Sequence, residues 1–204
     1  MYISIKNYER CSMSVNFRGS KTEQNLINSF AGEAQARNRY TYYSKIAKQE
    51  GYEQIAAIFL ETAENELAHA KLFYRHIGNI EYGHVDACYP FFIGDTLQNL
   101  ESAIKGEEEE FNDLYRRAEI TAMEEGFDDI AATFKHVRKV EEHHAKRYKE
   151  LYENLKNGTV FCKDTVQLWK CRECGYVWEG ESAPDYCPNC YHPKAYFEIL
   201  CEKY

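Results

Sequence analysis

An internal duplication constrains the fold of this chain more than any other feature of its sequence. The segment Gly51–Phe59 matches Gly126–Phe134, which lies 75 positions further along the chain. The same spacing pairs two acids and two histidines: Glu66 with Glu141, and His69 with His144. Between residues 21 and 157 the apolar residues recur with a period close to 3.6, which is typical of amphipathic helices. The chain therefore contains two related helical hairpins.

This periodicity predicts four long helices, over about residues 21–50, 52–78, 96–125 and 127–156. Ser20 and Glu23 predict a capping box at the start of the first helix. Two helical hairpins joined by one long connection describe an all-α four-helix bundle with ferritin-like connectivity.

One half of the duplication carries an extra residue. Gly32-Glu33 resembles Gly106-Glu107 at a spacing of 74 rather than 75, so the second half is one residue longer before its matching glycine. A single inserted residue in a long helix is commonly absorbed as a π-bulge, often at a functional site. We therefore expect a π-bulge between Glu107 and Gly126.

The composition excludes several classes of protein. The 204 residues carry a formal net charge of −8, which disfavours a nucleic-acid partner or an anionic membrane surface. The longest apolar run, Ile55–Leu60, is too short to span a bilayer, and the first fifteen residues show no secretory pattern. We expect a cytoplasmic protein with three parts: a loose N-terminal extension over residues 1–20, the helical bundle over 21–157, and a small C-terminal domain over 158–204.

Four glutamates interrupt the apolar stripes of the predicted helices, one on each helix: Glu33, Glu66, Glu107 and Glu141. Burying several carboxylates together is not tolerable without compensating positive charge. Glu66-x-x-His69 and Glu141-x-x-His144 each place two side chains on one helix face. Two such helices, with one glutamate from each of the other two, form a di-metal carboxylate site whose ligands suit iron or manganese. We predict two iron ions there.

Other acidic and histidine residues lie near these positions. Glu110 lies one turn from Glu107, and we expect it to join the site. Glu108 and Glu109 stay open, because an acidic run often marks an exposed face. Four residues are expected at the surface: Glu61, Glu64, Glu142 and His143.

The C-terminal region carries two Cys-x2-Cys knuckles, Cys171 with Cys174 and Cys187 with Cys190, which are separated by twelve residues. This spacing is typical of a tetrahedral four-thiolate site, and it does not separate iron from zinc. Short strands and turns are expected around it, with five packed aromatic residues: Trp169, Tyr176, Trp178, Tyr186 and Phe197. The remaining cysteines are expected to be small buried hydrophobic residues: Cys11, Cys88, Cys162 and Cys201.

Taken together, these motifs resemble the rubrerythrin family over nearly all of residues 21–204. The segments that carry the resemblance are Ala31–Tyr40, Glu61–Glu66 with His69–Lys71, Gly106-Glu107 with Glu110, Glu141–His144, and Cys187–Cys190 with His192–Phe197. The resemblance implies a ferritin-like domain with a di-iron site, followed by a small rubredoxin-like domain with one iron bound by four cysteines.

The resemblance also implies a role for each ligand. Glu66 and Glu141 would bridge the two irons. Glu33 would serve the first iron, and Glu107 together with His144 would serve the second.

Four further residues acquire roles in the same way. Glu110 would bind the first iron in the oxidised state and yield to His69 in the reduced state. Tyr40 and Tyr115 would lie behind the ligands and contact them.

The activity implied by the resemblance is a peroxidase that reduces hydrogen peroxide to water in oxidative-stress defence. Electrons would pass from NADH through a separate reductase or a rubredoxin, since the chain shows no Gly-rich dinucleotide fingerprint. They would enter at the four-cysteine iron of a head-to-tail homodimer or larger homo-oligomer. Three alternatives stay open at this point: a ferritin-type ferroxidase that stores iron, a non-enzymatic zinc-ribbon protein, and a di-iron oxygenase.

Overall fold

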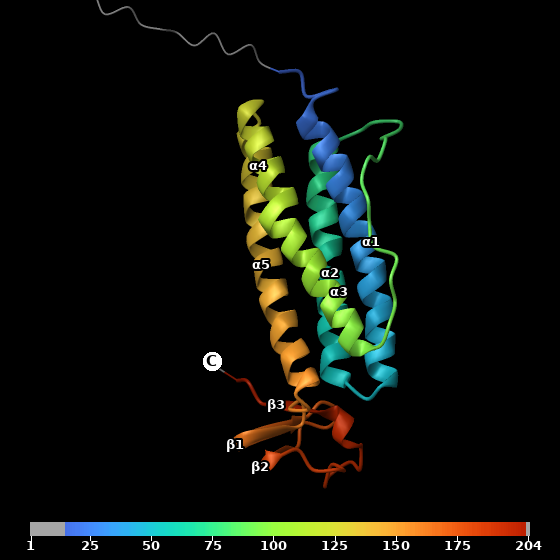
Figure 1. Cartoon of the computed structure of the whole chain (residues 1–204), viewed down its shortest axis with the longest axis vertical. Coiled ribbons are helices and arrows are strands. Elements are labelled where there is room, and N and C mark those ends of the chain that lie inside the picture. Colours follow the sequence, from blue (N-terminus) through green and yellow to red (C-terminus); the bar gives the residue numbers. More distant parts are fainter. Residues whose placement is uncertain (1–14, 203–204) are drawn as a thin grey trace, which may run out of the picture.

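The computed structural model describes residues 15–202 and shows a long helical bundle with a small strand-rich unit at one end (Figure 1). The bundle consists of α1 (Lys21–Gln49), α2 (Glu53–Ile77), α3 (Thr96–Glu109), α4 (Tyr115–Glu124) and α5 (Asp128–Lys156). A short π-helix, η1 (Glu110–Leu114), joins α3 to α4, so that the two form the single long helix predicted from the sequence. Residues 1–14 lie outside the described residues, and with them most of the predicted extension, including Cys11.

The π-bulge that the duplication predicts is present. The backbone N–H of Tyr115 donates to the carbonyl of Glu110, five residues earlier, where an α-helix would bond four residues apart. The prediction of a π-bulge between Glu107 and Gly126 is therefore confirmed.

The two halves of the bundle turn in the same way. Gly51 and Gly126 have φ angles of 86° and 85°, a left-handed conformation in which glycine avoids the Cβ penalty. Each glycine sits in the same set of three backbone hydrogen bonds, from residues 50–52 in the first half and residues 125–127 in the second. The two helical hairpins thus share the same turn geometry.

The ends of the helices differ in part from the prediction. The Ser20 hydroxyl accepts a hydrogen bond from the Glu23 N–H at 3.0 Å, as a capping box requires. The Glu23 carboxylate, however, accepts from the N–H of Gly19 at 2.7 Å rather than from that of Ser20, so the predicted box is only half formed. A complete box, which the sequence reading missed, starts α3, where Asp95 and Gln98 cap each other's backbone.

Two apolar clusters fill the bundle, and a layer of acids separates them. One cluster holds Tyr40, Phe59 and Tyr148, and the other holds Phe73 and Phe134. On each helix that contributes, the acidic position lies between residues of the two clusters, so the carboxylates are enclosed by apolar packing on both sides.

The C-terminal unit is a small antiparallel sheet in the order β2-β1-β3, with β1 (Cys162–Cys171), β2 (Val177–Ser182) and β3 (Phe197–Ile199). It lies below the bundle end that carries the α1–α2 turn, and Phe161 stacks on Tyr52 with ring centroids 6.1 Å apart (Figure 1). Trp169 and Phe197 are fully buried, as expected. Tyr186 is 66% exposed and Trp178 is also exposed, so their predicted packing is wrong.

The connection between α2 and α3 runs along α1 as an extended strap (Figure 1). The Tyr89 hydroxyl donates to the carbonyl of Asn28 at 2.6 Å, and the Asn28 side chain bonds both backbone groups of Asp86. Side chains of α1 thus hold in place a segment that has no helix or strand of its own.

Within residues 15–202, the structure contains no helix with the length and apolar character needed to cross a membrane.

Candidate metal centres

Six buried side chains meet at the acidic layer of the bundle. Glu33 comes from α1, Glu66 and His69 from α2, Glu107 from α3, and Glu141 and His144 from α5. Their ligand atoms form two groups in which all atoms lie within 4.8 Å of one another. The groups are Glu33-Glu66-His69-Glu141 and Glu66-Glu107-Glu141-His144. Glu66 and Glu141 belong to both groups, which is the arrangement that a pair of adjacent metal ions needs.

Both histidines present the same nitrogen to the acids. His69 Nδ1 lies 3.0 Å from Glu66 Oε2 and 3.0 Å from Glu141 Oε1. His144 Nδ1 lies 2.9 Å from Glu141 Oε2 and 3.3 Å from Glu107 Oε2. The two rings therefore enter the cluster from the two Glu-x-x-His helices in equivalent ways.

The outer nitrogens of the two rings differ. His144 Nε2 lies 3.1 Å from Asn65 Oδ1. In the neutral ring, a hydrogen bond from Nε2–H to this amide oxygen leaves Nδ1 as the unprotonated nitrogen that can bind a metal. For His69, no such partner is found among the described residues.

Two tyrosines bind the carboxylates across the bundle. The Tyr40 hydroxyl donates to Glu107 Oε1 at 2.5 Å, and the Tyr115 hydroxyl donates to Glu33 Oε1 at 2.5 Å. Burial raises the pKa of both phenols well above the usual range, and the nearby acids Glu107 and Glu110 add to the effect. Both tyrosines therefore stay protonated and hold the carboxylates in place.

The pKa shifts of the buried acids and histidines show that the layer is short of positive charge. Burial, followed by repulsion from Glu141 and Glu107, raises the pKa of Glu66 well above its usual value. Burial also raises the pKa of Glu141. Burial alone would lower the pKa of His144, but close contacts with Glu107 and Glu141 raise it to about 9. The cluster therefore favours added positive charge.

Several buried carboxylate oxygens accept no hydrogen bond of good geometry from any residue of the described chain: Glu33 Oε2, Glu66 Oε1, and both oxygens of Glu141, which lie at ion-pair distance from the two histidines. An acceptor left unbonded inside a protein is costly. All four atoms belong to residues of the two ligand groups, so two metal ions between the helices would satisfy them together. The donor set of carboxylate oxygens and imidazole nitrogens fits iron.

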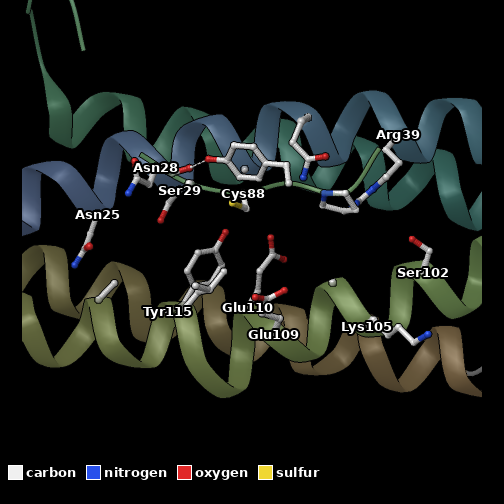
Figure 2. A pocket seen from close by; sticks show the side chains of 18 of the residues that line it. Asn25, Asn28, Ser29, Arg39, Cys88, Ser102, Lys105, Glu109, Glu110 and Tyr115 are labelled. Carbon is white, nitrogen blue, oxygen red and sulfur yellow. Dashed lines mark hydrogen bonds between the residues drawn. The ribbon is translucent and has the colours of Figure 1, made fainter. Parts of the chain in front are cut away.

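Glu110 lies beside the cluster but outside both groups of close ligand atoms. It is the first residue of η1 and lines a cavity between α1 and α3–α4, next to Tyr115 (Figure 2). Burial raises the pKa of the Glu110 carboxyl well above its usual value, and Glu33 and Glu107 add repulsion. The structure thus places Glu110 within electrostatic reach of the cluster while His69 lies in the ligand group.

The residues expected at the surface are found there or close to it. Glu61 and Glu64 are exposed and contact Arg147 and Arg37, and Glu142 contacts Lys146. His143 and Glu109 are exposed, whereas Glu108 is half-buried beside Lys149.

The four cysteines of the two knuckles converge at one point of the C-terminal unit. Cys171 Sγ lies 3.7 Å from Cys190 Sγ, and Cys174 Sγ lies 3.6 Å from Cys187 Sγ. These separations are far longer than the roughly 2.05 Å of a disulfide bond. All four sulfur atoms lie within 4.8 Å of one another, as a tetrahedral four-thiolate metal site requires.

The knuckle cysteines differ in exposure. Cys171 and Cys187 are buried, whereas Cys174 is exposed at the surface. Hydrogen bonds from the Asn189 side chain and the Tyr176 backbone lower the pKa of the Cys174 thiol to about 6. The site therefore has one thiolate edge that faces solvent.

The remaining cysteines do not behave as predicted. Cys88 and Cys201 are exposed, and Cys162 is only partly buried, so the expectation that they are buried hydrophobic residues is wrong. Cys88 lies on the strap over α1, and Cys201 follows β3 near the end of the chain, where little else packs.

Comparison with known proteins identifies the relatives of this chain. The family model for rubrerythrin matches residues 24–152, and the model for the rubrerythrin rubredoxin-like domain matches residues 169–198. The chain belongs to the rubrerythrin family. Rubrerythrin-1 of Clostridium acetobutylicum is 52% identical over 93% of this chain and 99% of its own length. Rubrerythrin of Porphyromonas gingivalis is 46% identical over 99% of this chain and all of its own length.

A solved structure supports the same assignment. Nigerythrin in a partially reduced state superposes with a TM-score of 0.60 at 33% identity, covering 94% of this chain and 90% of that chain. The predicted fold class, a ferritin-like bundle with a small rubredoxin-like unit, is therefore confirmed. The carboxylate–histidine cluster and the four-cysteine cluster fit the di-iron site and the rubredoxin-like iron site of rubrerythrins.

The sequence reading missed two polar residues near the di-iron site. Asn65 bonds His144, and its only sequence signal was its place directly before Glu66. Arg39 lies buried beside the cavity next to Glu110, and it stands within the rubrerythrin-like segment Ala31–Tyr40 without any distinguishing pattern.

Proposed function

We propose that this rubrerythrin-family protein is a peroxidase that reduces hydrogen peroxide to water and so serves oxidative-stress defence. The single observation that carries the proposal is the pair of ligand groups that share Glu66 and Glu141 inside the bundle. Family membership supports an oxidoreductase, and the adjacent four-cysteine unit supplies an entry point for electrons.

We assign the ligands from the geometry of the two groups. Glu66 and Glu141 would bridge the irons, with Glu33 on the first iron and Glu107 and His144 on the second. This division follows the membership of each residue in one group or in both.

His69 and Glu110 would exchange at the first iron. His69 belongs to the group of Glu33, and Glu110 stands next to it at the wall of the cavity. The iron pair, when bound, supplies the two electrons that cleave the O–O bond. A fifth carboxylate that can enter or leave would adapt the ligand set to the oxidation state.

The protein residues would handle position and protons. Reduction of hydrogen peroxide consumes two protons and two electrons and yields two molecules of water. Tyr40 and Tyr115 fix Glu107 and Glu33 through their short hydrogen bonds, so that the ligand frame stays rigid. Glu110 lies at the cavity wall, where it can carry protons from solvent to the departing oxygens.

Electrons would enter at the four-cysteine iron from an NADH-dependent reductase or a rubredoxin. Cys174 is exposed there and offers a thiolate edge to a donor. Within one chain, Lys156 at the end of α5 lies twelve residues beyond His144, about 18 Å along the helix. A head-to-tail homodimer would bring the unit of one chain closer to the di-iron site of the other. We also propose that the two metal-binding units coincide with residues 21–157 and 158–204.

The variant Cys174→Ser tests the direction of electron flow. We expect NADH-coupled peroxide turnover to fall by more than about tenfold, because removing one thiolate disrupts the four-ligand site. Single-turnover oxidation of the chemically reduced di-iron site by hydrogen peroxide should persist. Cys201→Ser is the control, since Cys201 is exposed and lies outside the cysteine cluster. Equal loss of both activities in Cys174→Ser would refute electron entry at this site.

A further inference from the structure

A large cavity opens beside the di-iron site. It has a volume of about 980 Å³ and lies between α1 and α3–α4, with residues of the α2–α3 strap along one side (Figure 2). Glu110 and Tyr115 project into it from the α3–α4 side (Figure 2). Hydrogen peroxide is little larger than water, whose share of liquid volume is roughly 30 Å³. The cavity instead matches the roughly 300–1,000 Å³ typical of sites for organic ligands.

One wall of this cavity carries a buried cation without a partner. Arg39 is only 6% exposed, and its Nε and Nη1 atoms make no hydrogen bond within residues 15–202. The other two basic side chains of the cavity are paired: Lys105 with Glu101 at 2.7 Å and Arg117 with Asp113 at 2.6 Å. A buried guanidinium without a hydrogen-bonded anion is costly, so this site favours a negatively charged ligand group.

The guanidinium of Arg39 is held in a fixed place. It lies 5.4 Å from the centroid of the Tyr40 ring, in the range of a cation–π contact. Its Nη2 atom also lies 3.4 Å from the position that a Cβ on Gly106 would occupy. The glycine therefore lets Arg39 approach the α3 backbone closely.

The distance between Arg39 and Glu110 along the cavity can be estimated from α3, because Arg39 lies against Gly106 of this helix. Gly106 precedes Glu110 by four residues, which corresponds to about 6 Å along the helix. A ligand that spans these positions needs about four methylene groups, and so about five bonds, between its carboxylate carbon and its hydroperoxide oxygen. The lining of the cavity also includes apolar side chains, among them Ala87, Pro90 and Leu114.

We propose that the cavity binds organic hydroperoxides that carry a carboxylate. Arg39 would hold the carboxylate, for which the planar guanidinium is well suited, and the hydroperoxide group would lie beside Glu110. This proposal rests on the proposed function, because it names a further substrate class for the same di-iron site.

The reaction balances like that of hydrogen peroxide. The O–O bond of R–O–O–H breaks, two protons and two electrons are consumed, and the products are R–O–H and water. The electrons are those that the proposed function already assigns to the reduced iron pair. No other reductant is needed.

The test compares three substrates on the iron-loaded protein: 5-hydroperoxypentanoate, pentyl hydroperoxide and hydrogen peroxide. In Arg39→Gln we expect kcat/KM for 5-hydroperoxypentanoate to fall at least about tenfold, mainly through KM, because a charged hydrogen-bond partner is lost. The other two substrates should change by less than about twofold, since neither carries a carboxylate. Arg37→Gln is the control, because Arg37 lies on the same helix but contacts Glu64 and does not line the cavity.

A binding measurement separates this proposal from the peroxidase function. Titration calorimetry with pentanoate should show binding to the unaltered protein and to Arg37→Gln but not to Arg39→Gln. Pentanoate binding with no peroxide turnover would overturn the proposed function and keep the anion site.

Other outcomes would overturn the anion site. They are absence of pentanoate binding, and an equal loss with all three substrates in Arg39→Gln, which would mean that Arg39 acts on the di-iron site instead. If Arg39→Gln does not fold, Arg39→Lys replaces it. This variant keeps the charge but loses the planar fork, and it should still weaken the carboxylate substrate selectively.

Discussion

The two halves of the bundle carry the same ligand pattern but build unequal metal positions. In the first half, α1 is a continuous α-helix, and Tyr40 follows Glu33 by seven residues. In the second half, Tyr115 follows Glu107 by eight residues, and η1 takes up the extra residue. Both tyrosines nevertheless reach the glutamate of the other half at the same distance of 2.5 Å. The π-bulge preserves the shared frame despite the insertion.

The extra residue coincides with an extra carboxylate. Glu110 begins η1, and the matching position of the first half is Ala36, which is buried in apolar packing. The outer contacts of the histidines differ in a similar way. Asn65 bonds His144, whereas the matching position for His69, 75 residues further on, is Val140, which cannot accept a hydrogen bond. Small changes to a duplicated frame thus leave His144 bonded at its outer nitrogen and His69 without such a partner among the described residues, which is consistent with the exchange proposed for His69.

The largest expected effect comes from the acids that the halves share. In Glu141→Gln, both ligand groups lose a carboxylate, so we expect most of the bundle iron to be lost while the four-cysteine iron remains. Iron content per chain, measured with the visible absorption of the four-cysteine site, checks this. Glu142→Gln is the matched control, because this neighbour contacts only Lys146 at the surface. Full retention of iron in Glu141→Gln would contradict the role of Glu141 as a ligand shared by both metal positions.

A smaller effect is expected when the second half is shortened to match the first. Deletion of the exposed Asn112 from η1 should restore an α-helix and keep the Tyr115–Glu33 hydrogen bond. It should also turn Glu110 away from the cavity and lower peroxide turnover by about tenfold or more, since the protein loses a proton-carrying group. Stopped-flow turnover together with a crystal structure of the deletion variant tests this prediction.

The control for the deletion is Glu110→Gln, which keeps the π-helix but removes the carboxylate. The two variants should lose turnover to a similar extent. Unchanged turnover in the deletion variant would show that the bulge has no part in the reaction.

The smallest effect is expected at the outer contact of His144. Asn65→Val places at this position the residue type that stands at the matching position of the other half, Val140, and removes the partner of His144. We expect the affinity for the second iron to fall by about 10–100-fold. The first iron should be much less affected. Mössbauer spectroscopy during titration of the metal-free protein with ferrous iron can follow the two positions separately. Equal weakening of both positions would contradict the proposed division of the ligands.

Much of this arrangement could be predicted from the sequence, because it depends on spacing along single helices. The helix ends fell within a few residues of their predicted places, and one shifted glycine located the π-bulge. Glu66 with His69, and Glu141 with His144, share helix faces at i and i+3, so their convergence needed no tertiary information.

The features that the sequence could not predict depend on contacts between elements. The strap has no periodicity, so nothing indicated that Asn28 and Tyr89 would fix it along α1 or that it would border a cavity. Arg39 stands among other polar residues of α1, so the sequence does not distinguish it. Its burial and its lack of a hydrogen-bond partner depend on how the helices pack. The exposure of Cys88 and Cys201 likewise could not be predicted, because both lie outside the helices and strands, where the sequence shows no periodicity.

Anomalous diffraction at the iron absorption edge, from crystals of protein purified without added metal, can show directly whether the bundle holds two irons. We expect three iron peaks for each chain: two flanked by the carboxylates of Glu66 and Glu141, and one among the sulfur atoms of Cys171, Cys174, Cys187 and Cys190. A map that shows the thiolate peak alone, with the bundle acids bonded to water or to one another, would contradict this expectation.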